Sequence, residues 1–364
     1  MKQRSVRACA LSLVVVLGGA AVAPAAPGPT RRARLGTRYI VERQTSDGSV
    51  PGFSPAGSTA DAVIAMVAAR RAPRAIRRAL LFLEKAASEA SLGQKAKIVL
   101  AVVAAGGDPR SFGGRDLVAD IKASQQPDGQ YAEAGDFTAV TTHALAMLAL
   151  EAAGEPHPAS ADRWLVDAQC PDGGWQYDRP HDDAEDAHCQ LSPGAPGSEF
   201  DAASDTNVTA YAVQALAATA VAIDPAVDPF DYFASARDKR KGGYRYSHQE
   251  ILFGTQQYTD ANSTALVLQA FVATGRDVPG AARKALGALQ YPRRCGRTRG
   301  AFAYTWVADD NGKLRRSPSR REAALKTDVS SIGATIAAIP GLVLKALPLP
   351  PAEVTRAAPA RKRC

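Results

Sequence analysis

The chain has 364 residues and a formal net charge of +8, and 46% of its residues are hydrophobic. This length allows one large domain or two ordinary ones, and length alone does not decide between them. The positive charge is a mild bias without a clustered basic patch, so it gives no support to a nucleic-acid partner.

The N-terminus has the pattern of a secretory signal peptide. Basic residues precede an apolar run at positions 8–23, and small residues and prolines follow. We assign residues 1–26 to the signal peptide, with cleavage between Ala23 and Ala26. The apolar run is too short to serve as a permanent transmembrane anchor. We therefore expect a secreted protein, either extracellular or associated with the cell surface.

Imperfect copies of one unit follow, each consisting of a helix, a turn and a second helix. The first helix is amphipathic and the second is almost entirely Ala, Val, Leu and Ile, so the first belongs outside and the second inside. Pro340 is expected to end the last inner helix, and residues 341–364 form a Pro-rich basic tail that wraps the outside or is loose. The units span residues 35–72, 73–109, 115–155, 159–223, 228–277 and 280–340.

Six outer and six inner helices are the number that a closed ring of six helix pairs requires. No unit can bury its apolar face alone, and an open solenoid would need polar end caps that the sequence lacks. We predict an all-α fold, an (α/α)6 toroid over residues 35–340. The connections of variable length all lie between a turn and the next inner helix, so we expect function at the end of the ring where the inner helices begin.

Four cysteines follow the signal peptide. An even number of cysteines in an exported chain favours disulfides over metal thiolates. Cys170 and Cys189 flank one loop, so we favour a bond between them. Cys295 and Cys364 then remain as the second pair.

Two polar stretches are candidates for binding sites. Residues 181–190 concentrate carboxylates and histidines that could bind calcium or zinc, but they lack the spacing of known loop or helix motifs, so a solvated acidic loop is favoured. Residues 238–246 include Arg240 and Arg245 near the inner-helix starts, where an anion could bind, although a charged rim is the favoured interpretation. We assign no metal and no cofactor.

The clearest turn carries a family resemblance. Trp164, Gln169 and the turn at 172–175 (DGGW) resemble the Gln-Trp repeat of squalene and oxidosqualene cyclases, with weaker copies at 121–131 and 40–49. The chain after the signal peptide resembles the single α/α toroid shared by terpene cyclases, protein prenyltransferase β subunits, cobalamin carriers and complement thioester domains. The resemblance implies that the Gln side chain and the aromatic ring tie the end of the outer helix to the turn.

The catalytic signatures of these families are missing. Class II terpene cyclases protonate an alkene with the middle Asp of Asp-x-Asp-Asp-Thr-Ala, and the matching position here is Asn207, which cannot donate that proton. Protein prenyltransferases hold zinc through Asp-x-Cys, and no Cys lies at that position. The context of Cys295 excludes a thioester. Asp205, Asp260 and Asp328 each begin an inner helix, so we predict that they are N-caps.

The resulting hypothesis is a secreted, noncatalytic binding module for an apolar small molecule or a surface protein. Its alternatives are a terpenoid cyclase or prenyl-transfer enzyme with a non-standard acid, and a cobalamin-type carrier. His143 could face the central cavity, although a packed core histidine is favoured. The candidate binding residues are His143, Trp175, Asp205, Asn207, Tyr211, Arg240, Arg245, Asp260 and Asn262.

Overall fold

The computed structural model describes residues 28–133, 139–177, 189, 204–219, 224–247, 258–292 and 296–352. The expected signal peptide, Cys295, Cys364 and all of the acidic loop except Cys189 lie outside the described residues. None of the helices in the described part of the chain combines the length and the apolar composition that crossing a bilayer requires.

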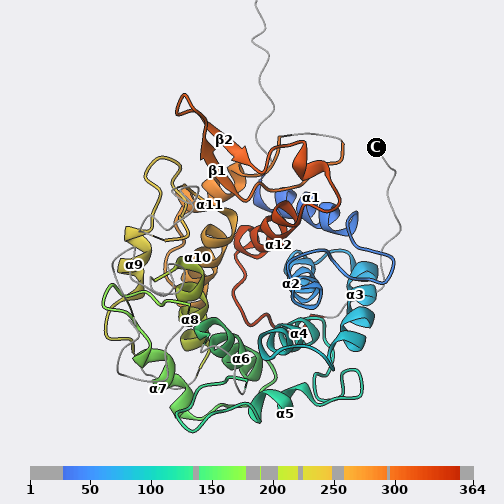
Figure 1. The fold of residues 1–364 in the computed structure, drawn as a ribbon, viewed down its shortest axis with the longest axis vertical. Coiled ribbons are helices and arrows are strands. Elements are labelled where there is room, and N and C mark those ends of the chain that lie inside the picture. Colours follow the sequence, from blue (N-terminus) through green and yellow to red (C-terminus); the bar gives the residue numbers. More distant parts are fainter. Residues whose placement is uncertain are drawn as a thin grey trace, which may run out of the picture.

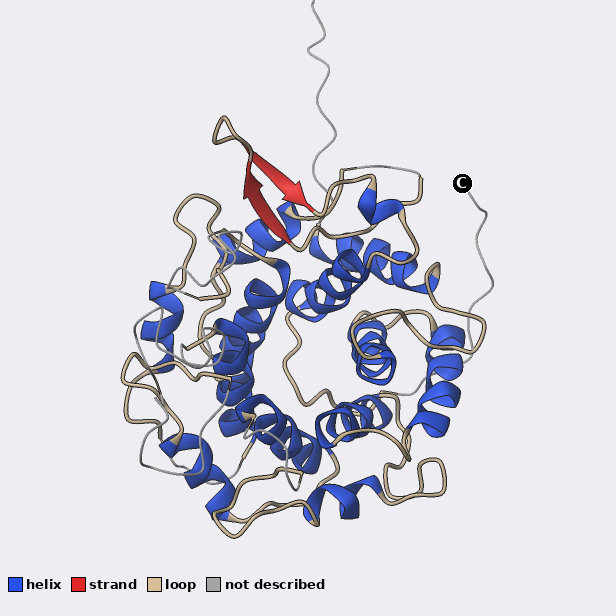
Figure 2. Ribbon diagram, in the orientation of Figure 1, coloured by secondary structure: helices blue, strands red, loops and turns tan. Residues whose placement is uncertain are grey.

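An inner ring of helices surrounds the centre of the molecule (Figures 1 and 2). Each inner helix contacts the next along the chain, and the last contacts the first, which closes the ring. The predicted α/α toroid is therefore confirmed. The inner helices are α2 (Pro55–Ala68), α4 (Leu92–Ala104), α6 (Val140–Ala152), α8 (Thr206–Ala218), α10 (Ala261–Ala273) and α12 (Val329–Val343).

The outer helices are amphipathic, as their sequences predict. In α3, for example, Ile76 and Leu83 are buried while the arginines of the helix lie outside. The first helix begins at Pro29, before the expected start at Leu35, because proline suits the first turn of a helix. The outer helices are α1 (Pro29–Val41), α3 (Pro73–Ala86), α5 (Leu117–Lys122), α7 (Ala159–Asp167), α9 (Pro229–Ser235) and α11 (Gly280–Ala288).

The insertion of the sixth unit contains structure that the sequence did not predict. Strands β1 (Thr305–Ala308) and β2 (Leu314–Ser317) form an antiparallel hairpin, and a short 3-10 helix, η1 (Glu322–Ala324), follows. The cationic groups of Lys241 and Arg316 lie 4.5 and 4.7 Å from the centre of the Trp306 ring of β1.

The Gln side chains of the resembled repeat join neighbouring units. Gln169 Nε2 donates to the carbonyls of Gly173 in its own turn and Val227 in the next unit, at 3.0 and 2.7 Å. Gln290 Nε2 donates to the carbonyl of Gly300 in its own turn and to that of Arg32 in the first unit. The same contact thus closes the ring.

A second repeated contact ties each turn to its inner helix. The first backbone N–H after the turn donates to a side chain on the inner helix, at 2.8 to 3.0 Å. In the third unit His143 takes the place of the usual threonine. The accepting side chains are Thr59, His143, Thr209, Thr264 and Thr335.

The predicted N-caps are present. Asp205 Oδ1 accepts from the amides of Asn207 and Val208, and Asp260 and Asp328 each accept from the amide three residues later. These bonds satisfy amides at the helix start that have no partner within the helix.

Pro340 does not end α12, contrary to the prediction. Proline in a helix interior removes a donor and costs about 3 kcal/mol. Here tertiary contacts hold the last turn: Leu342 is buried, and Arg283 Nε and Nη2 donate to its carbonyl at 2.9 and 2.7 Å. The helix therefore continues to Val343.

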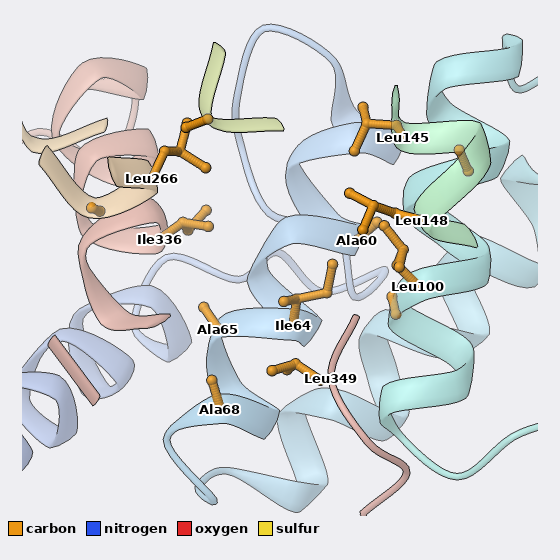
Figure 3. Packing of buried hydrophobic residues seen from close by; sticks show 14 of the residues in the cluster. Ala60, Ile64, Ala65, Ala68, Leu100, Leu145, Leu148, Leu266, Ile336 and Leu349 are labelled. Atoms are coloured by element: carbon orange, nitrogen blue, oxygen red, sulfur yellow. The ribbon is translucent and has the colours of Figure 1, made fainter. Parts of the chain in front are cut away.

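Residues 344–352, which we call the C-terminal segment, run across the ring and not around its outside (Figure 1). The Leu347 amide donates to Gln214 Oε1 of α8 at 3.0 Å, and the Ala352 amide donates to the Ala104 carbonyl of α4 at 3.0 Å. Figure 3 shows Leu349 among side chains of the inner helices, including Ile64 and Leu100. Because Leu349 is buried there, the segment closes the end of the ring where the inner helices finish.

One of the two expected disulfides falls within the described residues. Cys170 and Cys189 are bonded, as predicted. This bond holds Cys189 beside the fourth turn, where its amide donates to Gln176 Oε1 at 2.6 Å.

Candidate functional site

A cavity of about 560 Å³ lies inside the ring of inner helices. Volumes of 300 to 1,000 Å³ are typical of sites for small molecules, as an order of magnitude. Residues from α2, α4, α8, α10 and α12 line the cavity, and Leu347 of the C-terminal segment forms part of its floor. Phe53, which is 94% exposed, lies at the mouth, just before α2.

The repeated threonines explain which residues face the cavity. On α8, the lining residues Asn207 and Tyr211 lie two positions before and two positions after Thr209. Residues spaced by four and then three positions share one face of a helix. On every inner helix that carries the threonine, residues two positions before it and two or five positions after it line the cavity. They are Gly57, Asp61 and Ile64 on α2, Asn207 and Tyr211 on α8, Asn262, Leu266 and Gln269 on α10, and Gly333, Ala337 and Pro340 on α12.

The cavity lining combines polar and apolar side chains. Asn207 and Asn262 lie in the first turn of their helices, and the Ser263 hydroxyl oxygen lies 3.0 Å from Asn207 Oδ1. Ile64, Leu266 and Pro340 supply apolar surface, and Gln269 lies one turn beyond Leu266 on α10. A ligand that combines polar and apolar groups would therefore match the lining.

An ion pair crosses between two neighbouring inner helices within the cavity. Lys97 Nζ of α4 lies 2.8 Å from Asp61 Oδ2 of α2, and their side chains keep 25% and 32% of their surface exposed. Burial alone lowers the pKa of Lys97, but Asp61 and Tyr211 outweigh it and the pKa is raised. Lys97 is therefore a cation at neutral pH and not a nucleophile.

The Tyr211 hydroxyl belongs to the same polar cluster. Burial raises the pKa of Tyr211, with Lys97 lowering it and Asp61 raising it by smaller amounts. The phenol is thus neutral, and both charges act on it from the other side of the cavity. Asp61, Lys97 and Tyr211 form what we call the polar triad.

Three of the residues predicted from sequence line this cavity, namely Asn207, Tyr211 and Asn262. Asp205 and Asp260 lie behind the cavity wall as helix caps, and both are buried. Burial raises the pKa of each to about 7, although backbone amides oppose the shift.

His143 and Trp175 lie between the two layers of helices and not at the cavity. His143 Nδ1 accepts from the Tyr131 amide at 2.9 Å, so Nε2 carries the proton and donates to the Ala161 carbonyl at 3.0 Å. Trp175 is fully buried, and its indole N–H donates to the Leu165 carbonyl at 2.7 Å. These contacts make both residues part of the scaffold.

Arg240 and Arg245 lie near the fifth turn, outside the cavity lining. Arg245 Nη2 donates to the Ser235 carbonyl at 2.8 Å at the end of α9. The guanidinium of Arg240 lies 5.6 Å from the centre of the Tyr258 ring. The structure therefore does not bring these arginines together with the predicted residues that line the cavity.

Asp61, Lys97 and Leu347 were not predicted from the sequence to belong to a site. A charged residue on an apolar helix gives no sign of its partner, and Asp61 and Lys97 are far apart in the chain. One signal was available: Thr59 follows the first turn as Thr209 follows the fourth, so Asp61 corresponds to the cavity residue Tyr211. No group of three or more residues that could hold a metal ion occurs in the described ranges.

Comparisons with solved structures support the fold. The type II terpene cyclase MstE from Scytonema superposes with a TM-score of 0.54 and 16% identity, covering 86% of this chain and 97% of that one. An inactive variant of the α-1,6-mannanase GH76A of Salegentibacter sp. HEL1_6 gives a TM-score of 0.53 and 10% identity, covering 87% and 98%. A protein from Actinoplanes superposes with a TM-score of 0.51 and 17% identity, covering 87% of this chain and 99% of that one.

These similarities establish the α/α toroid fold of terpene cyclases and confirm the resemblance at that level. Identities this low extend to the fold alone, because one fold hosts many activities. No protein-family model matches the chain, and no curated protein matches it.

Proposed function

We propose that this protein is a secreted, noncatalytic binding protein that holds a small amphiphilic molecule in its central cavity. The observation that carries the proposal is the cavity of about 560 Å³ inside the ring, whose lining combines polar and apolar side chains and includes Leu347 of the C-terminal segment. Sites of this size and composition are typical of small-molecule binding.

We propose a noncatalytic role because the carboxyl groups in and around the cavity are already engaged by other groups of the protein. Asp205 and Asp260 use their oxygens to cap helices, and Asn207 stands where a class II cyclase would need its acid. Asp61 does face the cavity, but its carboxyl group is ion-paired with Lys97 at 2.8 Å. Because each of these carboxyl groups is engaged in a helix cap or an ion pair, none of them is placed to protonate an alkene.

Two structural neighbours were solved with a ligand bound, which supports a ligand-binding role. A variant of MstE was solved in complex with geranylgeranyl dihydroxybenzoate, and the mannanase variant with α-1,6-mannotriose. Secretion is supported by the N-terminal pattern and by the Cys170–Cys189 bond, because disulfides persist in oxidising compartments. Mass spectrometry of protein from the culture supernatant of its own host tests export by locating the new N-terminus near Ala26.

Filling the cavity tests the binding proposal. A Cβ at Gly333, which lines the cavity, would meet no heavy atom within 4 Å, so Gly333→Leu places its side chain in open space. Leucine also favours a helix interior by about 1 kcal/mol over glycine, so the fold should be retained. Gly280→Leu makes the same change at an exposed position on α11, also without a neighbour within 4 Å.

We expect the full chain to bind the uncharged dye Nile red, Gly333→Leu to weaken this binding at least tenfold, and Gly280→Leu to leave it unchanged. Native mass spectrometry of protein purified from its own host should show one bound small molecule that Gly333→Leu lacks. Equal dye binding by both variants, or turnover of squalene or a prenyl diphosphate by the wild type, would overturn the proposal.

A further inference from the structure

The cavity holds one positive and one negative charge, and these two lie against each other. Asp61 and Lys97 are the only carboxylate and ammonium groups among the described lining residues. Their oxygen and nitrogen are 2.8 Å apart. The lining phenols of Tyr211 and Tyr304 are neutral, because burial raises the pKa of each. The described lining is therefore polar but has no net charge.

A charged ligand would fit this lining poorly. An anion would be attracted by Lys97 but repelled by the adjacent Asp61. A cation would be attracted by Asp61 but repelled by Lys97. Placing an ion away from water is costly unless a free partner compensates it, and each member of the pair already has its partner. A ligand without net charge avoids this cost and leaves the pair intact.

The lining still has hydrogen-bonding capacity to offer. An ammonium group has three donors, and the bond to Asp61 engages one of them. In the part of the chain that the structure describes, Asn262 Oδ1 is buried at the cavity wall and has no donor. Asn262 Oδ1 has almost no surface accessible to solvent, so the remaining N–H groups of Lys97 are the donors that a hydroxyl oxygen of a ligand can reach.

We infer that the ligand is an uncharged amphiphile bearing a hydroxyl group, and that the Asp61–Lys97 pair selects against charged molecules with the same apolar part. This inference rests on the proposed function and specifies the ligand class. The apolar part would pack against Ile64, Leu266 and Pro340, and the hydroxyl group would accept a hydrogen bond from Lys97 within the polar triad.

A matched ligand series tests the inference. Octan-1-ol, octanoate and octylamine share one alkyl chain and at neutral pH differ in charge, and each is titrated against Nile red bound to the full chain. For the wild type we expect octan-1-ol to displace the dye at about tenfold lower concentration than either ion, a difference of about 1.4 kcal/mol.

Removing one charge of the pair should redirect the preference. Asp61→Asn leaves Lys97 without its counterion, so octanoate should overtake octan-1-ol. Lys97→Met leaves Asp61 alone, so octylamine should become the best of the three. The double variant has no charge in the lining and should again prefer octan-1-ol, which also shows that the substitutions leave the cavity folded.

The outcomes separate this inference from the proposed function. If the dye fails to bind the wild type, or binds regardless of Gly333→Leu, the cavity is no ligand site and both ideas are refuted. If dye binding is lost in Gly333→Leu but the three ligands keep one ranking in all variants, or if an ion binds the wild type best, the charge-selection inference alone is wrong.

Discussion

The inner helices have two faces that differ in how strictly they repeat. The face toward the turns carries nearly the same side chain in each unit, since Thr59, Thr209, Thr264 and Thr335 all accept a backbone amide. Two positions later, the face toward the cavity carries a different residue each time, namely Asp61, Tyr211, Leu266 and Ala337.

The difference follows from what each face must do. The turn-facing side chain satisfies a buried backbone amide, and the five units that have this turn present the same amide in the same place. The cavity-facing side chain contacts no repeated partner, so its chemistry is free to suit a ligand that has no six-fold repetition. The repeated contacts therefore belong to the scaffold, and the positions that break the repeat belong to the site.

The largest effect should come from the turn glycine that closes the ring. Gly300 has φ of +94°, and an added Cβ would lie 2.0 Å from the Leu35 carbonyl oxygen of α1. Gly300→Ala combines a strained backbone with a clash against backbone atoms, so we expect the free energy of unfolding to fall by about 3 kcal/mol or more. Urea denaturation followed by far-UV circular dichroism measures it.

Gly275→Ala is the matched control for this change. Gly275 also has a positive φ, of +67°, but an added Cβ would meet no atom within 4 Å. It should therefore cost only the conformational penalty of about 1 kcal/mol. Equal destabilisation by the two variants would show that the approach of the sixth turn to α1 does not hold the ring closed.

The next effect should separate the two faces of α8 directly. Thr209 Oγ1 accepts from the Trp175 amide at 2.9 Å, so Thr209→Val leaves that buried N–H without an acceptor at nearly constant volume. We expect a loss of about 2 kcal/mol in unfolding free energy. Tyr211→Phe, on the cavity face of the same helix, should change stability by about 0.5 kcal/mol or less.

For ligand binding we expect the opposite order, with a larger effect of Tyr211→Phe than of Thr209→Val. Tyr211→Phe removes a hydroxyl group of the polar triad, so octan-1-ol should displace Nile red less well from this variant than from the wild type. Thr209→Val should bind like the wild type at temperatures where it is folded. A result in which Thr209→Val is as stable as the wild type would contradict the assignment of that face to the scaffold.

The same division explains how much the sequence could predict. The ring, the amphipathic outer helices, the caps at Asp205 and Asp260, and the Cys170–Cys189 bond all depend on local patterns that recur or lie close in the chain. Such patterns are readable because each copy supports the others. All twelve predicted helices are therefore present in the described residues, even where individual ends were misplaced, as at Pro340.

The site could be predicted only in part because its residues do not recur. Asn207, Tyr211 and Asn262 were found through their positions beside helix starts, but the partnership of Asp61 with Lys97 depends on α2 and α4 being neighbours in three dimensions. The C-terminal segment was misplaced for a related reason. Its prolines suggested a loose tail, whereas the burial of Leu349 inside the ring is a tertiary effect.

The smallest predicted effect concerns Asp260, the N-cap of the inner helix α10. Burial raises the pKa of Asp260 from 3.8 to about 7, despite donation from the amide and hydroxyl groups of Ser263. In the unfolded chain the carboxyl group loses its proton near pH 3.8, so between these two values the folded state binds more protons. The stabilising contribution is thus complete below pH 3.8 and is lost as the pH rises through about 7.

Replacing this carboxyl group should remove its share of the pH dependence. Asparagine caps a helix as well as aspartate does but does not titrate, so Asp260→Asn should flatten the fall in stability between about pH 6 and pH 8 by about 1 kcal/mol. Urea midpoints at the two pH values measure this difference. Nile red binding should stay unchanged, because Asp260 caps α10 from behind the cavity wall. A loss of dye binding with an unaltered pH dependence would place Asp260 in the site and not in the scaffold.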